Sequence, residues 1–235
     1  MGKKLVIMQP YFMPYIGYFQ LMKHADTFIF LDDVNFINRG WINRNKILVN
    51  FTAKYITIPL KKASQNKLIN QIEIADDASW KSKMLKTIEF NYKKAPNFES
   101  AFGLIQEVLN DQSKSIADFN FNANQLLVKF LELNTKLSSS SREFNNRHLK
   151  GKDRILDICK KEGADEYINL PGGKALYSND EFTEAGIQLR FLEPQSIKYT
   201  QYKKEEFTPW LSIIDVIMFN TIEEVNQLLN KYDLT

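Results

Sequence analysis

Two adjacent carboxylates, Asp32 and Asp33, directly follow an apolar run at residues 27–31 and are the chain's best candidates for ionisable chemistry. Either of them can act as a general base toward an amine or a hydroxyl. Together they can also hold Mg²⁺ beside a diphosphate, because Mg²⁺ favours carboxylate oxygens as ligands. Hydrogen bonds to a ribose or another sugar, with no chemistry at all, explain the pair equally well. We predict that Asp32 and Asp33 are catalytic, with Mg²⁺ as the candidate cofactor and plain sugar binding as the alternative.

Planar hydrogen-bond donors are dense in the segment that follows Asp33. Arginine suits bidentate capture of a carboxylate or a phosphate, and tryptophan offers a stacking face for a sugar or a base. A polar hairpin around Gly40, with its tryptophan anchored in the core, accounts for the same composition. The predicted substrate-binding residues of this segment are Asn35, Arg39, Trp41, Asn43 and Arg44.

Other candidate binding residues follow the ends of further apolar runs. Gln9 and Tyr11 come after the run at residues 5–8, and Asn169 lies in the run at residues 166–170. The glycine pair behind Asn169 can bring backbone N–H groups close to an anion, although an ordinary turn fits it equally well. The predicted substrate-binding set is completed by Gln9, Tyr11, Tyr15, Gly17, Tyr18, Asn169, Gly172 and Gly173.

Two other polar features lie outside this set. Serine hydroxyls at residues 138–141 can bind phosphate after a strand end, but a serine run is more typical of a flexible turn. Asp215 lies in the apolar stretch 213–219, where a carboxylate must find a partner. We predict that Asp215 caps a helix or pairs with an arginine.

Composition excludes several classes of protein. The two histidines, His24 and His148, show no metal-ligand spacing, so zinc chemistry is not indicated. The single cysteine, Cys159, lies in an apolar helical pattern typical of a core thiol. A net charge of +3 is too small to make nucleic acid the main partner. No apolar run approaches the roughly 18 residues of a membrane span, and we predict a cytoplasmic protein whose oligomeric state stays open.

These side chains must be positioned by strands that end beside them. The continuous apolar runs at residues 5–8 and 27–31 are typical of strands buried on both faces of a parallel sheet. Between them, the apolar spacing from Tyr15 to Ala25 indicates a helix with Pro14 in its first turn. Ligands bind outside the carboxyl ends of such strands, where the polar residues occur. Further strands are predicted at residues 54–60, 72–74, 135–137, 166–170 and 187–192.

Helical periodicity runs through residues 78–134, with Ser79 as the predicted N-cap of the first helix. Another amphipathic helix is predicted at residues 150–164, with Gly163 as its C-cap. The predicted fold class is α/β. We expect a single domain over residues 1–235, built on a parallel, Rossmann-like sheet with a helical insertion at residues 78–134.

The placement of Tyr15, Gly17 and Tyr18 is similar to a motif of the HIGH-motif superfamily, which includes nucleotidylyltransferases and class I synthetases. Those proteins carry His-x-Gly-His at the start of the helix after the first strand, where this chain has Tyr-Ile-Gly-Tyr. The resemblance implies a sheet that cradles a nucleotide. Two tyrosines do not supply the imidazoles that stabilise charge developing on the phosphates.

Four blocks of the sequence resemble the WbqC-like family of bacterial proteins, and the similarity extends over nearly the whole chain. The blocks are MQPYFMPYIGYFQL, LDDVNFINRGWINRNKIL, YINLPGGKALY and LSIIDVIMFN. The family is associated with gene clusters for O-antigen and other surface polysaccharides, and some members are described as glycine transferases. The resemblance implies a transferase that adds a glycyl or other acyl group to the amine of a nucleotide-linked amino sugar. Its partners would be a nucleotide sugar and an acyl or aminoacyl donor.

Two alternative functions stay open. A nucleotide-dependent ligase or nucleotidylyltransferase follows from the HIGH-like placement and would release pyrophosphate from ATP or CTP. A non-catalytic sugar-nucleotide binding protein would bind its ligand and turn nothing over. Its distinguishing feature would be a polar pocket in which arginines already pair with both Asp32 and Asp33.

Overall fold

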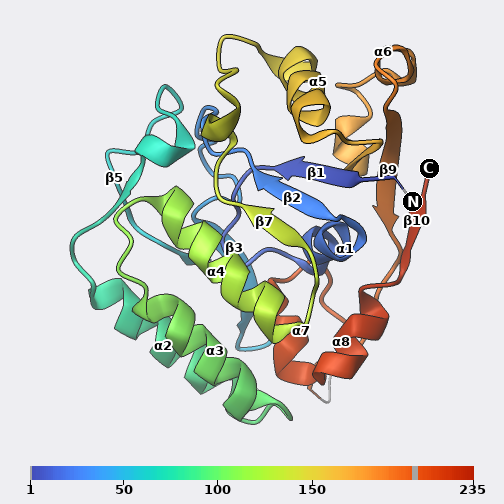
Figure 1. The fold of residues 1–235 in the computed structure, drawn as a ribbon. Helices are drawn as coiled ribbons and strands as arrows, with labels where there is room; N and C mark the ends of the chain where they lie inside the picture. Colours follow the sequence, from blue (N-terminus) through green and yellow to red (C-terminus); the bar gives the residue numbers. More distant parts are fainter. Residues whose placement is uncertain (1, 203–205) are drawn as a thin grey trace.

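Six strands form the main sheet in the part of the chain that the computed structural model describes, residues 2–202 and 206–235. Their order is β10-β9-β8-β1-β2-β7, and every neighbouring pair is parallel except β9 and β10. The protein is therefore a mixed α/β fold with a mostly parallel central sheet (Figure 1). The strands are β1 (Lys4–Met8), β2 (Thr27–Phe30), β7 (Lys136–Ser138), β8 (Glu166–Asn169), β9 (Gln188–Pro194) and β10 (Tyr232–Leu234).

The central strands are apolar because both of their faces are buried. Side chains alternate along β1, so Leu5 and Ile7 lie in one hydrophobic cluster and Val6 lies in the other. Helices from two sides complete these clusters. Figure 1 shows α5 and α6 on the opposite side of the sheet from α1 and α4. The cluster of Val6 includes residues of α1 (Ile16–His24) and α4 (Ile116–Phe130) among other helices, and that of Leu5 includes residues of α5 (Gly151–Glu162) and α6 (Asn179–Glu184).

The segment 78–134, predicted to be helical, folds mainly as three helices. These are α2 (Ser79–Tyr92), α3 (Phe98–Asn110) and α4, and α3 packs on α7 (Ile213–Phe219), which precedes α8 (Ile222–Leu228). Residues three or four apart on α2, such as Trp80, Met84 and Ile88, are buried as the periodicity predicts. The predicted N-cap role of Ser79 is wrong. Ser79 is already helical, and its hydroxyl donates to Asp77 at 2.8 Å.

Two other local predictions are corrected. The first helix begins at Ile16 instead of including Pro14, because the Pro14 carbonyl accepts the N–H of Ile213 at 2.8 Å and Tyr15 stays extended. The strand predicted at 54–60 is interrupted before Pro59, which has no N–H to donate. Instead, β3 (Arg44–Val49) and β4 (Thr52–Thr57) form a hairpin, and β5 (Leu60–Lys61) pairs with β6 (Glu73–Ile74).

The strand order defines one edge of the sheet as the place for a ligand. From β1 the chain first moves outward through β2 and β7, and then returns to the other side of β1 through β8 and β9. The order therefore reverses between β1 and β8. In open parallel sheets a crevice forms at such a point, outside the carboxyl ends of the strands. The connection after β1 starts at this edge.

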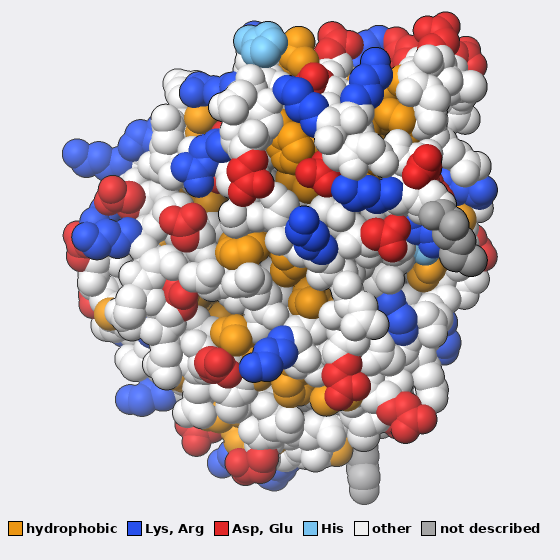
Figure 2. All heavy atoms as spheres, viewed as in Figure 1, with side chains coloured by type: hydrophobic (Ala, Val, Ile, Leu, Met, Phe, Trp, Pro, Cys, Tyr) orange, Lys and Arg blue, Asp and Glu red, His pale blue; other side chains and the backbone are white. Residues whose placement is uncertain are grey.

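The surface carries both signs of charge. Figure 2 shows Lys and Arg side chains interspersed with Asp and Glu over the face in view, consistent with the net charge of +3. That face presents no broad field of one sign that would attract a polyanion.

The described residues include no helix with the length and apolar character that crossing a bilayer requires.

Candidate functional site

The connection after β1, residues 9–15, is held in place through its backbone carbonyls. We call this segment the β1 loop. Asn120 Nδ2 of α4 donates to the Pro10 carbonyl at 2.9 Å, and Asn45 Nδ2 of β3 donates to the Met13 carbonyl at 2.7 Å. Five consecutive carbonyls, at residues 9–13, accept hydrogen bonds from side chains. The donors are Tyr18, Asn45, Asn120, Asn124 and Ser212.

These donors determine how rigid the β1 loop is. All five are buried, and they come from α1, β3, α4 and the residue before α7. A buried carbonyl without a partner is costly, so each donor favours one position of the loop. The loop is therefore preorganised by segments far apart in the sequence.

Two cavities adjoin the β1 loop and share one wall. The cavity of about 590 Å³, the large pocket, lies between the start of α1 and the segments 194–199 and 206–211. The cavity of about 350 Å³, the small pocket, lies between the β1 loop, Trp41 and the β3–β4 hairpin. Both have the size and the largely apolar lining of small-molecule sites. The shared wall consists of Tyr15, Pro209 and Trp210.

Tyr15 is the central residue of the shared wall. Its ring makes an edge contact with Trp210, with centroids 5.9 Å apart. Gly17 makes room for this ring, since a Cβ at Gly17 would come within 2.4 Å of it. Burial, reinforced by the neighbouring Tyr11, raises the pKa of Tyr15 to about 12. The Tyr15 hydroxyl is therefore protonated at neutral pH and available as a hydrogen-bond donor.

Aromatic faces and a lysine surround the small pocket. Trp41 and Trp210 are 41% and 64% exposed, so both rings are accessible to a ligand. Lys46 lines the same pocket, with its ammonium 5.2 Å from the centroid of the Tyr55 ring. This combination suits a ligand with an apolar ring face and an anionic group.

Asp215 connects the wall of the large pocket to the core. Its carboxylate accepts from Tyr199 Oη at 2.6 Å, Gln201 Nε2 at 2.6 Å and Tyr92 Oη at 2.8 Å. Burial raises the pKa of Asp215, although these hydrogen bonds oppose the shift. The prediction of a capping role or an arginine partner is wrong. Among the described residues its partners are two hydroxyls and an amide, and Ser212 caps α7.

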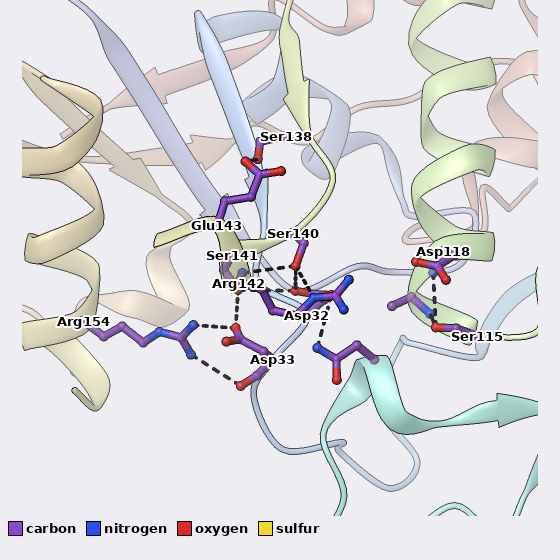
Figure 3. A network of polar contacts seen from close by, with 12 residues as sticks. Asp32, Asp33, Ser115, Asp118, Ser138, Ser140, Ser141, Arg142, Glu143 and Arg154 are labelled. Carbon is purple, nitrogen blue, oxygen red and sulfur yellow. Dashed lines mark hydrogen bonds and ion pairs between the residues drawn. The ribbon is translucent and has the colours of Figure 1, made fainter. Parts of the chain in front are cut away.

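Asp32 and Asp33 lie in a separate, buried polar network at the carboxyl end of β2 (Figure 3). Asp32 Oδ1 accepts from Ser140 Oγ at 2.6 Å, and Asp32 Oδ2 lies 3.5 Å from Nε of Arg142. Asp33 forms an ion pair with Arg154 of α5, and the two side chains are only 4% and 5% exposed. Burial raises the pKa of Asp32, opposed by the Ser140 hydrogen bond and the Arg142 charge.

This network does not fit Mg²⁺. The ion needs open carboxylate oxygens and keeps several waters, whereas a guanidinium group adjoins each aspartate and the Ser141 hydroxyl donates to Asp33. No cluster of three or more His, Cys, Asp or Glu side chains suited to a metal occurs among residues 2–202 and 206–235. Arginine pairing of both carboxylates is one part of the arrangement expected of a non-catalytic binding protein, but neither aspartate lines the large or the small pocket.

Comparison with known proteins places the whole site within one family. The model of the WbqC-like protein family matches residues 9–227. The chain belongs to the WbqC-like protein family. A relative in Mycobacterium tuberculosis (strain ATCC 25618 / H37Rv), described as "Uncharacterized protein Rv1507c", is 28% identical over 231 residues, which are 97% of each chain. No solved structure matches the chain. The family resemblance predicted from the sequence is thus confirmed.

This WbqC-like protein brings part of the predicted binding set into the small pocket, namely Tyr11, Tyr15 and Trp41. Tyr18 is fully buried and donates to the Gln9 carbonyl at 2.7 Å, so its hydroxyl supports the β1 loop. The Gln9 side chain points inward, with its Oε1 buried and unpaired among the described residues.

The predicted donors after Asp33 mostly bind the protein's own backbone. Arg44 donates to the Arg39 carbonyl and, at 3.2 Å, to the Gly40 carbonyl, and its guanidinium lies over the Tyr55 ring. Asn43 Nδ2 donates to a carbonyl beside β4, that of residue 58, at 2.9 Å. Asn35 is exposed and forms an isolated β-bridge with residue 68. These contacts shape the turn before β3.

The predicted anion turn after β8 lies away from both pockets, neither of which it lines. Gly172 and Gly173 form a 3₁₀ turn, η3 (Pro171–Gly173). A Cβ on Gly173 would meet Asn169 at 2.9 Å, so Gly173 permits close packing. The Asn169 side chain bonds locally, to Tyr167 Oη at 3.1 Å and to the N–H of Leu170 at 2.7 Å.

Sequence reasoning missed three residues that form these sites: Asn120, Arg154 and Trp210. The sequence does contain a signal for Asn120, because it and Asn124 are polar residues one turn apart within an apolar helical stripe. Arg154 shares such a stripe with Ile158. For Trp210 we find no local signal, since only the fold brings it to the β1 loop.

Proposed function

We propose that this protein is a transferase that adds a glycyl or other acyl group to the amine of a nucleotide-linked amino sugar. The small pocket carries the proposal. Its volume of about 350 Å³ suits a hexosamine, and its aromatic rings suit the apolar face of a pyranose. Lys46 in the same pocket suits the adjoining phosphate.

Two further observations support this proposal. Membership of the WbqC-like family is consistent with it, since the sequence resemblance implies work on surface polysaccharide precursors. If the six strands of the main sheet are numbered 1 to 6 in chain order and read across the sheet from β7 to β10, their order is 3-2-1-4-5-6. This is the strand order of dinucleotide-binding folds, although β10 is antiparallel here. We therefore infer that the sheet is Rossmann-like and that the β1 loop faces its ligand crevice.

The proposed reaction needs one base. The amine nitrogen attacks the acyl carbonyl, an N–C bond forms, and the bond to the leaving group breaks with its electron pair. The amine also loses a proton, which we assign to Asp32, because its carboxylate adjoins the exposed Arg142 whereas that of Asp33 is held in a buried ion pair. Asp32 is only 1% exposed and lines neither pocket, so in this proposal the proton reaches it along the Ser140 hydroxyl, which donates to Asp32 at 2.6 Å. Met8 pairs with Phe30, so Asp32 follows β2 at the same sheet edge as the β1 loop. Asp33, paired with Arg154, supports Asp32 in this proposal.

A non-catalytic sugar-nucleotide binding protein is the second candidate. It is favoured by the ion pairs of both aspartates with Arg142 and Arg154. The strand order also supports the ligase or nucleotidylyltransferase alternative. However, Tyr18, which takes the place of the second histidine of the His-x-Gly-His motif, is fully buried and donates a hydrogen bond to the β1 loop. Tyr18 therefore cannot reach a phosphate without leaving the core.

Mass spectrometry tests the proposal. Purified protein is incubated with UDP-glucosamine and, in turn, glycyl-adenylate and acetyl-CoA, and the nucleotide sugar is examined for an added acyl group. The expected result is a product that Asp32→Asn abolishes while the dissociation constant of UDP-glucosamine stays within about twofold. Binding without product in every mixture would favour the second candidate, and pyrophosphate release from ATP or CTP would favour the ligase alternative.

A further inference from the structure

We propose that the large pocket binds the nucleoside of the nucleotide sugar, so that the ligand passes over the Tyr15–Trp210 wall with its sugar in the small pocket. This inference rests on the proposed function and gives its substrate one orientation. A ligand made of a base, a diphosphate and a sugar needs two unequal compartments joined at a wall. Volumes of about 590 and 350 Å³ beside Tyr15 and Trp210 match that need.

Aromatic side chains form two walls of the large pocket. Tyr199 and Phe207 meet edge to face, with centroids 5.0 Å apart, and Tyr15 and Trp210 form the other aromatic pair. Stacking on aromatic rings lets proteins bind nucleobases of any type, because every base has a flat π-face. Asp215 fixes the Tyr199 hydroxyl at 2.6 Å, so this ring is held in place before a ligand arrives.

Several backbone groups beside these rings have no hydrogen-bond partner among the described residues. The segment after β9 is anchored by the N–H of Gln195, which donates to the Lys231 carbonyl at 3.1 Å. Beyond it, the backbone N–H and C=O groups of Ser196, Ile197 and Lys198 form no hydrogen bond with any residue of 2–202 or 206–235. All three residues line the large pocket. Unpaired donors and acceptors next to aromatic faces are what the polar edge of a base requires.

Charged side chains fit the remaining parts of the ligand. Lys198 lines the large pocket and Lys46 lines the small one, so an ammonium lies on each side of the shared wall. A diphosphate that crosses the shared wall would therefore have an ammonium group on each side of it. Glu206, an exposed residue, also lines the large pocket and would repel a phosphate placed beside it. A carboxylate there instead suits the hydroxyls of a ribose.

Isothermal titration calorimetry on the full chain tests this orientation. The probes are UDP, ADP, GDP, CDP and dTDP for the nucleoside half, and glucosamine 1-phosphate for the sugar half. Phe207→Ala alters only the large pocket and Trp41→Ala only the small one. Phe90→Ala is the matched control, since Phe90 is 70% exposed and lines neither.

We expect Phe207→Ala to weaken the best nucleoside diphosphate about tenfold, the size of one lost stacking contact, and to leave glucosamine 1-phosphate unchanged. Trp41→Ala should show the reverse pattern, and the Phe90→Ala control should change neither. Ser196→Trp, at an exposed position, should block nucleoside diphosphates by filling the large pocket. Circular dichroism of each variant verifies the fold.

The inference is overturned if no nucleoside diphosphate binds the wild-type chain, if Trp41→Ala instead of Phe207→Ala weakens it, or if Ser196→Trp leaves its affinity unchanged. These results are separable from the proposed function. Nucleoside binding in the large pocket without acyl transfer would leave the inference standing and remove the transferase. Acyl transfer by Phe207→Ala with an unchanged KM for the nucleotide sugar would support the transferase function and remove the inference.

Discussion

Replacing Arg154 by methionine should destabilise the fold strongly, because it leaves Asp33 as a buried carboxylate without its cationic partner. The Arg154 side chain is 5% exposed and that of Asp33 is 4% exposed, so water cannot replace the lost partner. Arg154 Nε also donates to Asn146 at 3.0 Å, and that bond is lost as well. Breaking a buried pair of this kind costs about 3–5 kcal/mol. For a chain of this size the melting temperature should fall on the order of 10 °C.

The matched control is Arg142→Met, the same substitution at the other aspartate of the network. Arg142 is 59% exposed and its Nε lies 3.5 Å from Asp32, so the free energy of unfolding should change by less than about 1 kcal/mol. Urea unfolding followed by circular dichroism measures both variants, and equal slopes justify comparing them. The double variant Asp33→Leu with Arg154→Met should recover most of the loss, because an apolar pair replaces the ion pair. If Arg154→Met unfolds within 1 kcal/mol of the wild type, or if both arginine variants lose the same amount, the reasoning is wrong.

Three further outcomes are expected. Gly17→Ala should weaken UDP-glucosamine binding while the chain stays folded, since its Cβ would come within 2.4 Å of the Tyr15 ring; Gly103→Ala, with nothing within 4 Å, should leave binding unchanged in the same calorimetric titration. Asn120→Ala leaves two buried carbonyls unpaired, 2.9 and 2.7 Å from its amide, and should lower the free energy of unfolding by about 2 kcal/mol or more, measured in urea. Burial raises the pKa of Asp215, so the stability that its protonated form contributes is complete below the ordinary carboxyl pKa and is lost as pH rises through the raised one. Asp215→Asn should remove that fall in unfolding free energy above the ordinary carboxyl pKa of about 4, and an unchanged slope would contradict the assignment.

The sequence predicts the elements in which burial determines the residue type at nearly every position. The runs at β1, β2 and β8 are continuous because both faces of each strand are covered, and Gly163 ends α5 with a φ of 62° as a C-cap glycine should. The β3–β4 hairpin was not predicted as a unit. Most of β4 is exposed, so its apolar residues do not alternate with a buried face, and only its pairing with β3 defines it.

The candidate site was predictable only where its residues lie within the first two of the four sequence blocks. Tyr11, Tyr15 and Trp41 come from these blocks, and they do line one pocket. The ion pair of Asp33 with Arg154 joins residues 121 positions apart, and no local pattern tells which arginine reaches the carboxylate. Trp210 is likewise brought to Tyr15 by the fold alone.

The hydrogen bonds from α4 to the β1 loop limit how this protein can vary. Loops and insertions on α/β sheets are often exchanged between relatives to change specificity, because the sheet does not depend on them. Here Asn120 and Asn124 of the helical segment hold the carbonyls of Pro10 and Tyr11, which belong to the β1 loop. Shortening or replacing that segment would remove the supports of the β1 loop together with its surface. New specificities should therefore arise by substitution around Trp41, Phe207 and Trp210, with the helices at residues 78–134 kept as a fixed part of the architecture.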